Sequence, residues 1–163
     1  MRKIDKEVYV ASGAHIIGDV VIGADCGVWY NAVIRGDEDS IEIGSRTNIQ
    51  DNSVLHVDTG FPLKIGSDVT IGHGAIIHGC TIGNNVLVGM GAIIMNGAVI
   101  GDNSIIGAGA LVTQNTEIPS GSVAFGNPAK VRGEVKDEDL VHILYNADVY
   151  VKLAHESLKR YEE

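Results

Sequence analysis

Residues 82–118 read IGNNVLVGMGAIIMNGAVIGDNSIIGAGALVTQNTEI, and this stretch decides the fold. An aliphatic residue begins each hexad in it, and Gly, Asn or Asp follows three positions later. Those three residue types tolerate left-handed backbone angles, so they mark a turn in every hexad. Two residues of turn and four of strand make one short straight edge, and three such edges close a triangular coil of about 18 residues. The pattern therefore predicts an all-β solenoid of parallel strands.

The same hexad phase extends along most of the chain. Eighteen of nineteen hexad starts between residues 10 and 124 are Ile, Val or Leu, and seventeen of the nineteen residues three places further on are Gly, Asn or Asp. Arg46 and Cys80 are the two exceptions at the second position. We expect each aliphatic residue to point inward and stack on its counterpart one coil away, at the roughly 4.8 Å spacing of neighbouring strands.

The last part of the chain changes period and predicts a helix. Asp137 is the expected N-cap. One apolar stripe follows at alternating spacings of four and three: Leu140, Leu144, Ala147, Val151, Ala154, Leu158 and Tyr161. A single stripe needs a partner, so the helix should pack back along the solenoid. We expect one domain over residues 1–163, with a β-helix at about 8–131 and a C-terminal α-helix at about 137–161.

Composition and charge limit the partners. The formal net charge is −9, which disfavours nucleic acid because like charges repel. The two cysteines, Cys26 and Cys80, are far apart and indicate a reducing compartment without a disulfide framework. Neither a signal peptide nor an apolar run of membrane-spanning length is evident. We therefore expect a cytoplasmic protein with no membrane partner.

The hexad phase slips in three places, and these breaks point to the functional site. Three extra residues lie within 37–40, and a four-residue excess falls in the segment that contains 58–62. One residue is missing between Ile77 and Ile82. Insertions in a solenoid become loops on one face, often the binding face.

Coil arithmetic places three polar residues in one outward column. His56 and His78 are 22 residues apart, which is one coil plus the four-residue insertion. Arg35 lies 21 residues before His56, which is one coil plus the three-residue insertion. Glycine usually fills this position in the repeat, so we expect the column to be functional.

His73 belongs to the preceding edge, where it should stack over Asp51, 22 residues earlier. A corner separates it from the column of His56 and His78, so a neighbouring subunit would have to supply it. A closed ring of three is natural for a triangular solenoid. Three neutral imidazoles with an open fourth position describe a catalytic zinc that carries water. Alternatively, His56 and His73 could act as acid–base groups.

Three segments carry a family resemblance: residues 33–38 (VIRGDE), 48–56 (NIQDNSVLH) and 71–80 (IGHGAIIHGC). They resemble the γ-class carbonic anhydrases, and the similarity extends over nearly the whole chain, including residues 126–130 (GNPAK), which acyltransferases share. The resemblance implies a left-handed β-helix and the reversible hydration of carbon dioxide, a small-molecule substrate, to bicarbonate. It also implies a homotrimer with three interface metal sites that hold Zn2+, which Fe2+ or Co2+ could replace.

The resemblance also implies roles for individual residues. His56 and His78 would come from one subunit and His73 from the next. Arg35 and Asp51 would pair across the interface, either as part of the catalytic machinery or as an ion pair that fixes the trimer. The remaining residues would surround the metal: Gln50 to hydrogen-bond its water, Glu38 to handle protons, and Asn48 and Tyr150 to line the pocket.

The chain departs from the best-studied family members in one loop. Residues 57–62 replace a longer acidic loop, and Asp58 is the only acid among them. We therefore expect slower proton exit and modest turnover. Three other functions stay open: a hexapeptide acyltransferase with an acyl-coenzyme A donor, a metal-dependent thioesterase or other hydrolase, and a catalytically weak scaffold.

Overall fold

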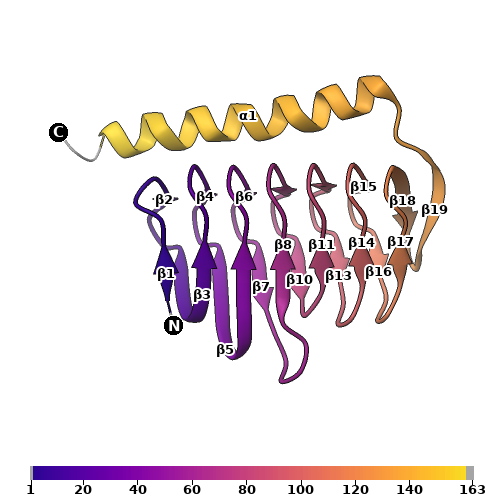
Figure 1. The fold of residues 1–163 in the computed structure, drawn as a ribbon, viewed down its shortest axis with the longest axis horizontal. Helices are drawn as coiled ribbons and strands as arrows, with labels where there is room; N and C mark the ends of the chain where they lie inside the picture. The colour runs from indigo at the N-terminus through magenta and orange to yellow at the C-terminus, as the bar shows by residue number, and fades with distance from the viewer. Residues whose placement is uncertain (1, 161–163) are drawn as a thin grey trace.

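The computed structural model describes residues 2–160, which form strands β1 to β19 followed by helix α1 (Figure 1). The elements are β1 (Lys3–Ile4), β2 (Tyr9–Val10), β3 (His15–Ile22), β4 (Gly27–Val28), β5 (Val33–Ile43), β6 (Asn48–Ile49), β7 (Val54–His56), β8 (Leu63–Ile65), β9 (Thr70–Ile71), β10 (Ile76–His78), β11 (Thr81–Ile82), β12 (Leu87–Val88), β13 (Ile93–Ile94), β14 (Val99–Ile100), β15 (Ile105–Ile106), β16 (Leu111–Val112), β17 (Glu117–Ile118), β18 (Ser122–Gly126), β19 (Ala129–Glu134) and α1 (Asp137–Arg160).

The strands form the three faces of a triangular solenoid. The first face contains the start of β3 and of β5, followed by β7, β10, β13 and β16. The second face contains β1, the ends of β3 and β5, and then β8, β11, β14 and β17. The third face runs from β2 through β4, β6, β9, β12, β15 and β18, and ends in the antiparallel strand β19. The coil winds as a left-handed parallel β-helix, as expected.

The inward ladder of aliphatic residues forms the core. On the first face, Ile34, Leu55, Ile77 and Ile94 stack in register, and each is fully buried. Val10 is an exception to the expected burial: it is in register with Val28 but 41% exposed, because β2 ends the third face.

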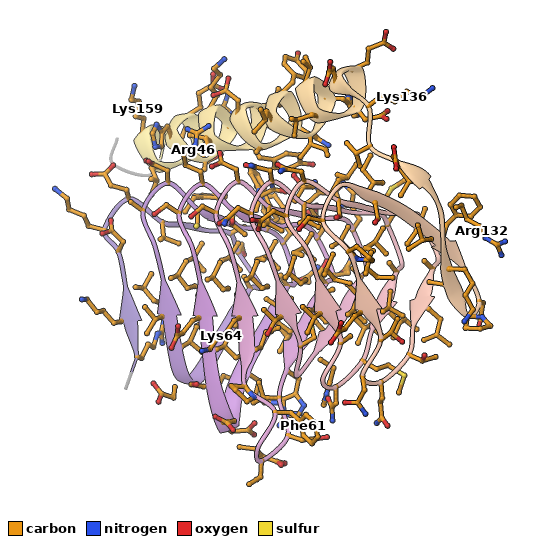
Figure 2. The ribbon with its side chains drawn as sticks, turned by 45° about the vertical axis from the view of Figure 1, so that its right-hand side comes forward. Arg46, Phe61, Lys64, Arg132, Lys136 and Lys159 are labelled. Atoms are coloured by element: carbon orange, nitrogen blue, oxygen red, sulfur yellow. The ribbon has the colours of Figure 1, made fainter. Side chains whose placement is uncertain are left out.

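The turn positions also follow the repeat. Arg46, one of the two exceptions in residue type, still adopts a left-handed φ of 58°. Its side chain is held by Asp68 at 2.7 Å and by Asp148 of α1 at 3.5 Å, and Figure 2 shows Arg46 beside the helix. Near Cys80 the left-handed residue is Gly79, with φ of 50°, because one residue is missing from this hexad.

The two insertions project from the side of the solenoid opposite α1 (Figure 1). The extra residues at 37–40 do not interrupt the strand as a loop would, since β5 continues through them. The connection between β7 and β8 does form a loop, with Phe61 on the projecting part (Figure 2). The Gly60 N–H donates to Asp39 Oδ2 at 3.0 Å, so the two projections are tied together.

Helix α1 returns along the third face and contacts β2, β4, β6 and β9 (Figure 1). Its buried residues are Ile143, Ala147, Val151 and Ala154. The expected stripe is therefore wrong at Leu144, which is 41% exposed, whereas the preceding residue Ile143 is fully buried. Spacings of three and four both keep a residue on one helix face, and here the spacing of four before Ala147 applies. Tyr161 lies outside the described residues.

The start of α1 differs from the expected cap. Leu140 N–H donates to the carbonyl oxygen of Lys136 at 3.0 Å, and Asp139 Oδ2 accepts from the Lys136 N–H at 3.0 Å. Lys136 is therefore the N-cap residue in place of Asp137, and Asp139 supplies the reciprocal half of a capping box.

Cys26 and Cys80 are free thiols, and both are buried. Burial raises the pKa of Cys26 and of Cys80 to about 12, so neither thiol is reactive at neutral pH. Within residues 2–160, no helix is both long and apolar enough to cross a membrane.

Candidate functional site

The expected polar column exists on the first face. The strand register pairs Arg35 with His56, and His56 with His78. The two imidazoles meet edge to face, with ring centroids 4.9 Å apart, and His56 Nδ1 lies 3.0 Å from His78 Nε2. The solenoid thus aligns two ring nitrogens by stacking one coil on the next.

Asp37 holds the outer side of this pair. Its Oδ1 lies 3.0 Å from His56 Nε2, and its Oδ2 accepts from the Arg35 guanidinium at 2.6 Å. The hydrogen bond from Arg35 keeps the pKa of Asp37 below its ordinary value. Within one chain, therefore, Arg35 pairs with Asp37, which lies in the part of β5 that contains the insertion.

Asn96 and Asp58 hold the other side. His78 Nδ1 lies 2.5 Å from Asn96 Oδ1, and Asn96 Nδ2 donates to Asp58 Oδ2 at 2.6 Å. One potential ligand atom from each of His56, Asp58 and His78 lies within 4.8 Å of the others. Sequence reasoning missed Asn96, because the missing residue shortens this coil to 17: Ile77 pairs with Ile94, so Met95 and not Asn96 lies one coil after His78.

His73 lies at the opposite end of the first face. It follows β9, and its Nδ1 lies 2.8 Å from Asp51 Oδ2, which confirms the expected stacking. Strand β10 separates His73 from His78, and His73 is not part of the ligand cluster found among the described residues. One chain therefore brings together two of the three expected imidazoles.

A cavity of about 430 Å³ adjoins His73, between the third face and α1, and Gln50 and Tyr150 are among its lining residues. Gln50 Oε1 accepts from the His73 backbone N–H at 3.2 Å, and Gln50 Nε2 donates to Asn48 Oδ1 at 3.1 Å. Asn48 is buried, and its amide donates to Thr70 Oγ1 at 2.9 Å. Asn48 therefore supports Gln50, which itself faces the cavity.

The remaining expected residues lie at the edges of these features. Tyr150 of α1 packs edge-on against Trp29, with ring centroids 5.4 Å apart, and burial raises its pKa. Glu38 is exposed on the projecting part of β5, next to Asp37. A second cavity of about 280 Å³ adjoins His78 and is lined in part by Asp58 and Asn96.

Comparisons with known proteins find hexapeptide-repeat proteins and carbonic anhydrases among the relatives of this chain. The family described as bacterial transferase hexapeptide (six repeats) matches residues 62–94 and 79–114. A protein of Methanocaldococcus jannaschii, provisionally named a carbonic anhydrase, is 57% identical over 98% of this chain and 99% of its own length. The mitochondrial γ-carbonic anhydrase 2 of Arabidopsis thaliana is 45% identical over 98% of this chain, which spans only 61% of that protein.

A solved structure agrees with the fold. A Bacillus cereus protein, provisionally named an acetyltransferase, superposes with a TM-score of 0.94 and 42% identity, over 95% of this chain and 90% of that one. High identity to carbonic anhydrases over almost the full chain accompanies the paired histidines and the hexapeptide solenoid. The chain belongs to the γ-carbonic anhydrase family.

Proposed function

We propose that this protein is a metal-dependent carbonic anhydrase, which reversibly hydrates carbon dioxide to bicarbonate. The observation that carries the proposal is the 3.0 Å separation of His56 Nδ1 and His78 Nε2. Two nitrogens bound at 2.0–2.1 Å to a tetrahedral zinc lie about 3.3 Å apart, so this pair fits the ion with little adjustment. Zinc is the expected metal, and Fe2+ or Co2+ also suits imidazole ligands.

The third imidazole would be His73 of a neighbouring subunit, in a homotrimer. The first face presents an outward apolar stripe of Val54, Ile76 and Ile93, each between 36% and 40% exposed. Exposed apolar stripes of this kind mark surfaces that pack against another protein. A threefold ring would bring the His73 end of one subunit to the His78 end of the next. Arg35 and Asp51, which also lie near opposite ends of this face, would meet at the same boundary.

When bound, the metal would lower the pKa of a coordinated water to about 7. The chain's own groups would do the rest. Gln50 uses one amide hydrogen on Asn48, so its second N–H can orient a substrate oxygen in the cavity. Glu38 is exposed beside Asp37, which contacts His56, and would carry the released proton to solvent.

The direct test is a stopped-flow pH-indicator assay on the fully metallated protein, with His56→Ala as the inactive control. We expect modest turnover that imidazole-type buffers increase, because the short loop offers only Asp58 as an acid. Elemental analysis should find close to one divalent metal per subunit, and light scattering should give a trimer. Activity no greater than that of His56→Ala, even in such buffers, would remove the assignment.

Acyl transfer from acyl-coenzyme A is the second candidate. The 430 Å³ cavity beside His73 is larger than carbon dioxide requires, and apolar residues form much of its lining. Thiol release from acetyl-coenzyme A in the presence of a panel of small amines and alcohols would favour this reading. Thiol release without an acceptor would instead favour a thioesterase. If none of these reactions is detected, a catalytically weak scaffold remains.

A further inference from the structure

We propose that Asn96 is a positioning residue that fixes the tautomer of His78 and so decides which ring nitrogen is presented to the metal. The inference rests on the metal site proposed above. It concerns a residue in the next coil, which reaches His78 through the amide of its side chain and has no contact with His56 or His73 among the described hydrogen bonds.

The hydrogen-bond partners determine how the Asn96 amide is oriented. Asp58 is a carboxylate, which only accepts, so the group 2.6 Å from its Oδ2 must be the Asn96 NH2. Asn96 Oδ1 therefore faces His78 Nδ1 at 2.5 Å, and this oxygen can only accept. A neutral His78 must therefore carry its proton on Nδ1, which leaves a lone pair on Nε2.

His56 is constrained in the same way by Asp37. Its Nε2 faces Asp37 Oδ1 at 3.0 Å, so a neutral His56 carries its proton on Nε2 and has its lone pair on Nδ1. The two lone pairs then face each other across the 3.0 Å gap between His56 Nδ1 and His78 Nε2. Two acceptors at this distance repel, and a cation held between them removes the repulsion. Asn96 thus contributes to a pair that is arranged for a metal ion.

The backbone holds Asn96 in place. Asn96 is only 8% exposed. Its backbone carbonyl oxygen accepts a hydrogen bond of 3.0 Å from the backbone N–H of Asn115 in the following coil. Gly79 makes the approach to His78 possible, because a Cβ there would lie 2.6 Å from Asn96 Oδ1 and 2.8 Å from Phe61 Cβ. The contact with Asp58 also ties the β7–β8 connection to the coil that supports His78.

The first experiment reads the tautomer in metal-free protein, by ¹⁵N-edited NMR of the histidine rings at about pH 8.5, where ordinary imidazoles are neutral. We expect wild-type His78 to be protonated on Nδ1. In Asn96→Leu, His78 should move toward the Nε2–H form, because it can then donate to His56 Nδ1. A wild-type His78 protonated on Nε2, or a tautomer unchanged by Asn96→Leu, would overturn the inference whether or not the protein binds metal.

The second experiment measures zinc affinity by competition with a chelator. Loss of an outer hydrogen-bond partner of a ligand histidine typically weakens metal binding 10- to 100-fold, so we expect a loss of about that size in Asn96→Leu. The matched control is Asn84→Ala, which removes another corner asparagine, one that accepts from the Ser67 N–H and lies in a different corner. An equal loss in Asn84→Ala would show a general effect on the solenoid and would overturn the inference.

A paired exchange separates positioning from folding. Asn96→Asp combined with Asp58→Asn keeps an oxygen acceptor for His78 and reverses the donor and acceptor of the second hydrogen bond. We expect this double variant to restore the Nδ1–H tautomer and most of the zinc affinity that Asn96→Leu loses. Failure to restore either, in a protein with wild-type circular dichroism, would count against the role. Absence of zinc binding in the wild type would refute the proposed function alone, because the NMR result still decides the role of Asn96.

Discussion

The division of the site between subunits can be tested by mixing two inactive variants. His56 and His78 meet at 3.0 Å within one chain, whereas His73 lies beyond β10 against Asp51. His73→Ala therefore removes the ligand at one edge of each subunit, and His78→Ala removes a ligand at the other edge. A homotrimer of either variant should contain no complete site. In a mixed trimer, a site is complete when a His73→Ala subunit supplies the pair and a His78→Ala neighbour supplies His73.

The expected recovery follows from this arrangement. With random assembly of equal amounts, the two subunits at an interface have the required order in about one case in four. Co-refolding should thus recover about one quarter of the wild-type bound zinc and carbon dioxide hydration, measured by elemental analysis and stopped flow. The control mixture, His56→Ala with His78→Ala, should recover neither, because both residues must come from the same subunit.

Two results would refute this reasoning. Mixed trimers that recover nothing would show that the three histidines do not form a shared site. Full metal binding by His73→Ala alone would show that the ligand set is completed within one chain, where Asp58 lies close to His56 and His78. In that case the neighbouring subunit would not be needed for the metal.

Three further predictions concern the fold. Ile143→Ala should lower the free energy of unfolding by about 2–5 kcal/mol, whereas the exposed Leu144→Ala should cost clearly less, as urea denaturation would show; equal losses would contradict the orientation of α1. Both buried thiols should resist an aromatic disulfide reagent at pH 8 in native protein and react fully in denaturant, because their pKa values of about 12 keep them protonated. The hydrogen bond from Lys152 lowers the pKa of Asp148, so its stabilisation is full above the ordinary aspartate pKa and is lost as pH falls through the lowered value. Asp148→Asn should therefore reduce the difference in thermal stability between pH 7 and pH 3, and an unchanged difference would count against this ion pair.

The solenoid and the paired histidines were predictable because both depend on counting residues. A coil of fixed length turns a sequence separation into a neighbour in space, and the insertions only had to be added to it. The separation of 22 residues therefore placed His56 beside His78, and His73 beside Asp51. The same rule failed for Val10, since register alone does not say where the stack ends.

The features that the sequence did not predict depend on side-chain orientation and on local departures from the repeat. Asn96 contacts His78 through a side-chain amide, and no repeat position specifies where such an amide points. Asp37 reaches His56 from the insertion in β5, where the phase of the repeat no longer applies. For α1, Ile143 and Leu144 are both apolar and adjacent, so the pattern could not decide which one faces the solenoid.

The geometry of the solenoid also implies that the proposed metal would stabilise the trimer. A straight edge between two corners keeps His73 and His78 of one chain apart, so a site that uses both must link two chains. A metal that binds only the assembled form stabilises that form by about 2.7 kcal/mol when its free concentration is one hundred times the dissociation constant. Three such sites would act on one ring, each at a different boundary. The histidines that would serve the chemistry would therefore also favour closure of the trimer, and the flat apolar stripe of the first face would need to supply only part of the association energy.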